Sequence, residues 1–179
     1  MSVHPVLRLG HPTLFRVAEN VSEFNTPTLH ALVQDMLDTM AAESGVGLAA
    51  PQIGVSQRLV VFGVQDNPRY PGREPVPTTV LVNPQIIPLG EAIDEDWEGC
   101  LSIPQMRGWV PRHRQILYTG FDAEGRPIER EASGFHARLV QHECDHLDGV
   151  LFPQRMHDLS RFGFEQADFP PATGPREAR

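Results

Sequence analysis

Two histidines and a glutamate in the segment QHECDH could together activate a water molecule on a metal ion. His142 and His146 are four positions apart, about 400° around a helix, so both imidazole rings would lie on the same face, one turn apart. Glu143 lies beside them and could accept a proton from the water without being a ligand. The chain has eight histidines, so the pair alone is weak evidence. The glutamate inside the pair favours a metal site over a surface helix with scattered histidines.

A third protein ligand is needed, because two histidines leave the ion under-coordinated. Downstream, His157 and Asp158 stand at spacings that do not match the metalloprotease pattern. Upstream, Cys100 in WEGCLSIP could supply a thiolate, which binds iron or zinc strongly, although a free cysteine taken alone is more often a buried hydrophobe. Cys144 lies about 200° around the helix from His142, which predicts a packing role. The predicted ligand set is Cys100 and the two histidines, with one position left for water.

The elements that must position these residues indicate the α+β class. Apolar residues recur at helical spacing over 27–43, and the apolar run RLVVFGV at 58–64 is typical of a buried strand. Over 78–131, β-branched runs alternate with proline, glycine and acidic clusters, which predicts an antiparallel sheet region. A second helix, from about 134 to 148–149, carries the histidines. We therefore expect antiparallel sheets around a central metal-binding helix.

A chain of 179 residues fits a single domain with a buried core. We assign residues 1–160 to the domain that carries the metal site and 161–179 to a partly disordered C-terminal tail. Phenylalanines at 162, 164 and 169 could pack back on the body, and the last eight or so residues are expected to be unanchored. A surface loop is predicted over 65–77, where aspartate, asparagine and prolines cluster.

The composition excludes several classes of protein. A formal net charge of −8, from 15 basic and 23 acidic residues, argues against specific binding of nucleic acid. No apolar stretch reaches the roughly 18 residues of a transmembrane helix, and the N-terminus lacks the apolar core of a signal peptide. With only two cysteines and no export signal, a disulfide is not favoured. We predict a cytoplasmic protein with no membrane partner.

Three segments resemble the signature motifs of peptide deformylases, in the same order along the chain. They are GVGLAAPQ at 45–52, EGCLS at 98–102 and QHECDH at 141–146. The similarity extends from the N-terminus to about Phe152 and includes VNP and the ASGFHARLV lead-in to the second helix. The chain thus resembles hydrolases that remove the formyl group from the N-terminal formyl-methionine of nascent polypeptides and release formate.

The resemblance implies a role for each residue of the site. Glu143 would be the general base that activates the water and then protonates the leaving amine. The side-chain amide of Gln52 and the backbone N–H of Leu101 would hold the oxyanion, and for Gln52 this role rests on the motif match. The family implies one Fe²⁺ per chain, with Zn²⁺, Ni²⁺ or Co²⁺ as substitutes. Iron beside a thiolate implies sensitivity to oxygen.

The same resemblance implies a substrate pocket that receives the formyl-methionine. Glycines permit close backbone approach, so the peptide could pair with the GVG segment as an added strand, although a tight turn would need the same glycines. Apolar residues of the motifs could wall the methionine slot, or belong to the core. The predicted substrate-binding residues are Gly45, Val46, Gly47, Arg107, Phe135 and Leu139. Arg107 could steer the peptide backbone or be solvated, and Arg138 resembles an arginine of organellar deformylases.

Two other functions share parts of this pattern. A zinc metalloprotease would use the same helix to cleave internal peptide bonds, but the EGCLS cysteine and the glutamine of GVGLAAPQ argue against it. A non-catalytic, metal-binding relative that recognises nascent chains or ribosomes would be expected to lose Glu143, which is present here. A transient ribosome contact through a cationic patch at Arg155, Arg161 and the arginines of the tail is a further hypothesis.

Overall fold

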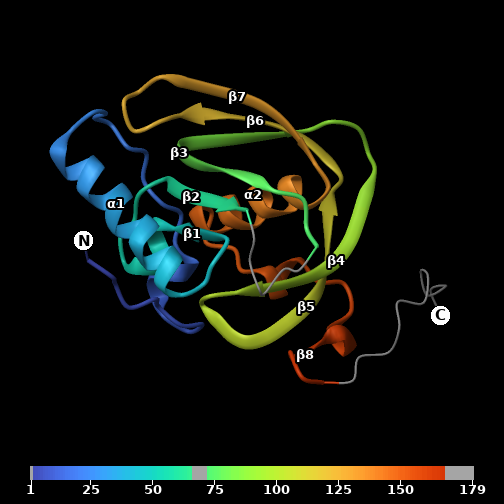
Figure 1. Ribbon diagram of the computed structural model, residues 1–179. Helices are drawn as coiled ribbons and strands as arrows, with labels where there is room; N and C mark the ends of the chain where they lie inside the picture. Colours follow the sequence, from blue (N-terminus) through green and yellow to red (C-terminus); the bar gives the residue numbers. More distant parts are fainter. Residues whose placement is uncertain (1, 66–71, 168–179) are drawn as a thin grey trace.

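The central element of the fold is a helix, α2 (Gly134–Leu147), that lies between two antiparallel sheets (Figure 1). The computed structural model describes residues 2–65 and 72–167. One sheet contains, in spatial order, β1 (Gly47–Ala49), β2 (Leu59–Val64), β3 (Val76–Pro88), β6 (Gln115–Phe121) and β7 (Pro127–Ser133). The other contains β4 (Ile93–Cys100), β5 (Ile103–His113) and β8 (Phe162–Phe164). The predicted α+β class, with antiparallel sheets around a central helix, is confirmed.

Helix α2 is enclosed on all sides rather than lying on a surface. Every residue from 137 to 147 is buried. Val140, Cys144 and Leu147 pack into the apolar cluster of the five-stranded sheet. The helix ends where Gly149 adopts φ +70°, a left-handed conformation that favours glycine. A side chain there would also meet the backbone of Phe15 at 2.6 Å, so the predicted stop is fixed by packing as well as by conformation.

Helix α1 (Pro27–Ala42) packs against the other face of the small strands β1 and β2. The Thr26 side chain accepts a hydrogen bond from the Leu29 N–H at 3.2 Å and so caps the helix. The buried side chains Val33 and Met36 form the apolar face that the sequence spacing indicates. The prediction of a helix over 27–43 is confirmed to within one residue, and that of a strand over 58–64 is confirmed by β2.

The part of the tail that is described forms structure. Strand β8 pairs with β5, and Phe162 packs against the apolar cluster that contains Cys100. Short 3-10 helices complete the fold: η1 (Pro12–Phe15), η2 (Ala50–Ile53), η3 (Phe152–Arg155) and η4 (Leu159–Arg161). Phe169, the last eight residues and residues 66–71 of the predicted loop lie outside the described residues. The boundary at 160 therefore stays a prediction.

Across the described ranges, no helix combines the length and the apolar composition that crossing a membrane requires.

Candidate active site

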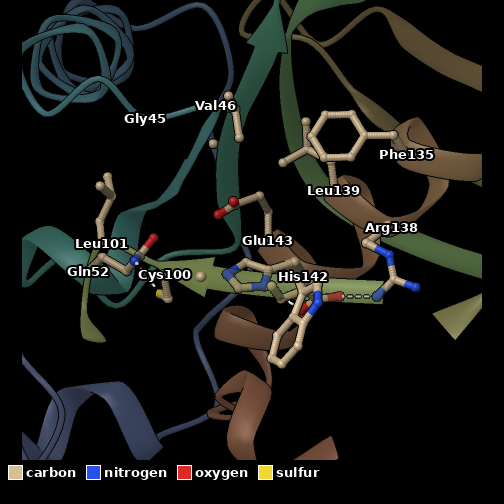
Figure 2. Close-up of a pocket in the computed structure, with 14 residues that line it drawn as sticks. Gly45, Val46, Gln52, Cys100, Leu101, Phe135, Arg138, Leu139, His142 and Glu143 are labelled. Carbon is tan, nitrogen blue, oxygen red and sulfur yellow. Dashed lines mark hydrogen bonds and ion pairs between the residues drawn. The ribbon is translucent and has the colours of Figure 1, made fainter. Parts of the chain in front are cut away.

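Strand β4 and helix α2 bring three metal-ligating side chains together. Cys100 ends β4 beside His142 of α2 (Figure 2), and His146 follows His142 by four positions on the same face of that helix. Their ligand atoms all lie within 4.8 Å of one another, and the Cys100 Sγ is 3.3 Å from the His146 Nε2. A tetrahedral ion with ordinary metal–sulfur and metal–nitrogen bond lengths would separate such atoms by about 3.3–3.6 Å. The geometry therefore fits one ion on these three side chains.

The charges of the site also fit a cation. Burial alone would raise the pKa of the Cys100 thiol, but the charges and hydrogen bonds of His146 and His142 lower it well below its usual range. Cys100 is therefore poised as a thiolate, which is the form that binds metals. One thiolate and two imidazoles are a donor set suited to zinc or iron.

Glu98 holds His142 in the orientation that a metal ligand needs. The Nδ1 of His142 lies 2.9 Å from the Glu98 Oε2, so the Nε2 is left for the ion. Burial would raise the pKa of Glu98, but Arg112 and His142 lower it, so the carboxylate is ionised. The Arg112 Nε and Nη2 donate to its two oxygens at 2.9 and 3.0 Å. The motif EGCLS does not by itself give Glu98 a role, although Glu98 and Cys100 are two positions apart and so share one face of an extended strand.

Arg138 is a second cation on the same carboxylate. Its Nη1 donates to the Glu98 Oε1 and to the Val110 carbonyl, each at 2.7 Å, and its Nη2 donates to the Asp94 carbonyl at 2.7 Å. The side chain is 6% exposed. Arg138 lies four positions before His142, so helical spacing places it on the face of α2 that meets β4. Its guanidinium is thus engaged with the protein at the back of the pocket.

We expect Arg138→Met to lower the free energy of unfolding by about 2–3 kcal/mol, because it leaves buried carbonyl and carboxylate oxygens with fewer donors. Urea denaturation of the metal-loaded protein measures the loss. Arg114→Met is the matched control, since the Arg114 side chain is 64% exposed and its Nε lies no closer than 3.6 Å to the Asp94 Oδ2. An exposed pair of this kind contributes about 0–1 kcal/mol. Equal midpoints for the two variants would contradict the role given to Arg138.

Glu143 points into the cavity beside His142 (Figure 2). Its Oε2 is buried and, among the described residues, has no hydrogen-bond partner. Burial raises the pKa of Glu143 to about 7, close to the optimum for a general base at neutral pH. A side chain at Gly47 would place its Cβ 2.1 Å from the Glu143 Oε1, so this glycine is required by the carboxylate itself.

Gln52 and Leu101 lie on the opposite side of Cys100 from His142 (Figure 2). The Ala49 N–H donates to the Gln52 Oε1 at 2.8 Å, which fixes the amide so that its Nε2 faces Cys100. The Nε2 donates to the Ser102 Oγ at 3.1 Å and lies 3.5 Å from the Cys100 Sγ. This orientation can present an N–H to a negative oxygen beside the ion.

The cavity collects most of the predicted substrate-binding residues. Val46, Phe135 and Leu139 form apolar walls, and Gly45 and Gly47 line the β1 side. Arg107 is not among the lining residues; its guanidinium lies 4.7 Å from the ring centroid of Trp97. Trp97 lines the cavity and was missed, because an aromatic residue in a strand is usually a packing residue.

Cys144 lies apart from the ligand cluster, as helical spacing predicts. It belongs to the apolar cluster between α2 and the five-stranded sheet, and burial raises the pKa of its thiol. Both cysteines are free, so the site contains no disulfide.

Comparison with known proteins gives one consistent result. The family model for polypeptide deformylase matches residues 3–162. Peptide deformylase 1 of Nitrosomonas europaea is 58% identical over 171 residues, which cover 96% of this chain and 97% of that protein. Peptide deformylase 1 of Bordetella pertussis is 55% identical over 94% of this chain and 96% of its own. A Met-Ala-Ser-bound class I type b peptide deformylase from Acinetobacter baumannii superposes with a TM-score of 0.84 at 40% identity, covering 87% of this chain and all of that one.

Proposed function

Since the chain belongs to the peptide deformylase family, we propose that it removes the formyl group from N-terminal formyl-methionine of nascent polypeptides with the residues of the cavity between β1, β4 and α2. The observation that carries this assignment is the position of Glu143. Its buried carboxylate, without a hydrogen-bond partner among the described residues, faces the space beside three metal-ligating atoms. A base in that position suits hydrolysis by an activated water.

The side chains divide the reaction between them. Cys100, His142 and His146 would hold the ion, which when bound supplies a Lewis acid that makes water more acidic and polarises the formyl carbonyl. Glu143 takes a proton from the attacking water as the new carbon–oxygen bond forms. The Gln52 Nε2 and the Leu101 N–H donate to the formyl oxygen as it becomes negative. Glu143 then gives its proton to the amine nitrogen as the carbon–nitrogen bond breaks and formate leaves.

The pocket supports formyl-methionine as the substrate. Val46, Phe135 and Leu139 offer an unbranched apolar side chain a slot next to the reacting atoms. Gly45 and Gly47, at the edge strand β1, leave the backbone accessible to a peptide that adds as a further strand. For Arg107, which stacks on Trp97, we propose an indirect influence on the peptide through that ring.

We further propose Fe²⁺ as the working ion, with Zn²⁺, Ni²⁺ or Co²⁺ as substitutes. The donor set of one thiolate and two imidazoles supports each of these metals. Anaerobic purification followed by elemental analysis identifies the ion. If iron is the working ion, activity declines on aeration, and exchange for nickel or cobalt slows the decline. An unchanged rate of decline after exchange would contradict the proposal.

Formate release from formyl-Met-Ala-Ser by anaerobically purified protein is the direct test of the function. We expect turnover with about one ion per chain, and no turnover after the ion is removed with a chelator. Stoichiometric metal without formate release would indicate a different amide substrate or a non-catalytic relative. Cleavage of internal peptide bonds in an unformylated peptide would indicate a protease.

The proposed substrate places the enzyme where nascent chains emerge, which in bacteria is the cytoplasm. A transient ribosome contact remains a separate proposal. Two of its arginines already serve the fold: Arg155 pairs with Asp145 at 2.7 Å, and Arg161 lies 3.9 Å from the Trp109 ring centroid. The contact would be supported if the protein co-sediments with ribosomes in a salt-dependent manner and if Arg155→Ala and Arg161→Ala weaken this co-sedimentation. Absence of co-sedimentation would contradict the proposal.

A further inference from the structure

The two proposed oxyanion donors come from different parts of the fold. Gln52 lies in η2, directly after β1 of the five-stranded sheet. Leu101 lies in the turn between β4 and β5 of the three-stranded sheet. The distance between the two donors therefore depends on contacts that join the sheets. Preorganised donors are effective only when their geometry is set before the charge develops.

Three consecutive residues near the N-terminus make such contacts. The Leu7 N–H donates to the Gln52 carbonyl at 2.8 Å. The Leu9 N–H donates to the Ser102 carbonyl at 2.8 Å. Between them, the Arg8 Nη1 donates to the Leu101 carbonyl. Residues 7–9 thus bind the backbone on both sides of the proposed oxyanion site.

Side chains in and next to this segment pack into two different apolar clusters. Val6 is buried in the apolar cluster shared by α1, β1 and β2. Leu7 packs against the cluster that contains Cys100. The Leu101 side chain lies against Gly45, since a Cβ built there would be 3.0 Å from the Leu101 Cδ1. The turn at Leu101 therefore contacts both the N-terminal segment and the GVG segment.

We propose that residues 7–9 form a brace that sets the position of the Leu101 turn relative to Gln52, and that Arg8 is a positioning residue for the deformylation step. The inference rests on the proposed function, because it assigns the brace to the donors of that reaction. Arg8 is exposed and touches the turn through its guanidinium, so its removal leaves the apolar core and the three metal-ligating side chains in place.

The test compares Arg8→Ala with Arg8→Lys and with Leu9→Ala. Leu9→Ala is the matched control, since it removes a half-exposed side chain from the same segment but keeps the backbone N–H that binds Ser102. We expect Arg8→Ala to lower kcat about three- to tenfold, the range that loss of one hydrogen bond gives, with KM within about twofold. Metal content stays at the parent value, and the melting temperature falls by no more than about 4 °C, the shift that about 1 kcal/mol gives in a chain of this size. We expect Arg8→Lys to have at least half of the parent kcat and Leu9→Ala to have the full parent kcat.

Hydrogen exchange of the peptide 98–103 provides a readout that does not depend on activity. Its amides exchange faster in Arg8→Ala and at the parent rate in Leu9→Ala. The brace would be contradicted if Arg8→Ala kept both the kcat and the exchange rate of the parent. It would also be contradicted if Leu9→Ala lost as much kcat as Arg8→Ala, or if the loss of kcat in Arg8→Ala matched a loss of bound metal. A metal-loaded parent that releases no formate would refute the proposed function instead, while the exchange comparison would still decide whether Arg8 holds the turn.

Discussion

Replacing Glu143 with glutamine is expected to lower kcat for formate release by about 10²- to 10⁴-fold, the usual contribution of a general acid–base group. The amide keeps the shape of the carboxylate, which matters because the side chain lies directly against Gly47. It cannot accept the proton of the attacking water. Since Glu143 is placed beside the ligands and not among them, the variant should still bind about one ion per chain. Steady-state kinetics and metal analysis of the same sample measure both outcomes.

A pH profile separates loss of the base from a general loss of structure. Burial raises the pKa of Glu143 to about 7, and a bound cation would lower it again. A base acts in its deprotonated form, so kcat/KM of the parent should rise with pH through the pKa that Glu143 has in the metal-loaded protein. The Glu143→Gln variant should lack that rise. Glu131→Gln, an exposed change on β7, is the control and should keep both the rate and the profile. Parent-like turnover in Glu143→Gln would show that another group is the base.

The parts of the site that lie close together in the sequence could be predicted from it. His142 and His146 share a face of a helix at i and i+4, and Glu143 inside that pair favours a metal site over scattered histidines. Cys100 is a candidate third ligand from the residues, and the family resemblance strengthens it, since a free cysteine is by itself more typical of a core. The structure places Cys100 beside the histidines because β4 ends against α2, so the last residue of the strand meets the face of the helix that carries them.

The burial of α2 could not be predicted from its composition. Gln141 and Asp145, which share a face of the helix at i and i+4, would ordinarily indicate a solvent-exposed face, because polar and charged residues are mostly exposed. In this fold β4 and β5 cover that face and supply the partners, since Arg112 binds both Glu98 and Asp145. The sequence shows the charges but not the pairing, because each partner comes from a different element. The brace at residues 7–9 escaped prediction for the same reason, as its hydrogen bonds are long-range.

Replacing Cys100 with alanine is expected to remove metal and activity together. The thiolate is the one anionic ligand of the proposed set, and without it two neutral imidazoles must hold a divalent cation in a buried site. Loss of a residue that merely orients a ligand weakens metal affinity about 10- to 100-fold, and loss of the ligand itself should exceed that range. Dialysis against a chelator, followed by elemental analysis and a formate assay, should find less than a tenth of the parent metal and turnover, a bound set by that range.

Cys144→Ala is the control that the chain itself provides. Both cysteines are buried, but Cys144 packs in the apolar cluster behind α2 and away from the ligand atoms. Its replacement should cost about 1 kcal/mol of stability through the small cavity it leaves, with metal content and kcat unchanged. If Cys144→Ala lost the ion while Cys100→Ala kept it, the ligand assignment would be wrong. Loss of the ion in both variants would indicate that the substitutions disturb the fold. Loss of the ion in Cys100→Ala alone would identify the thiolate at the end of β4 as the ligand.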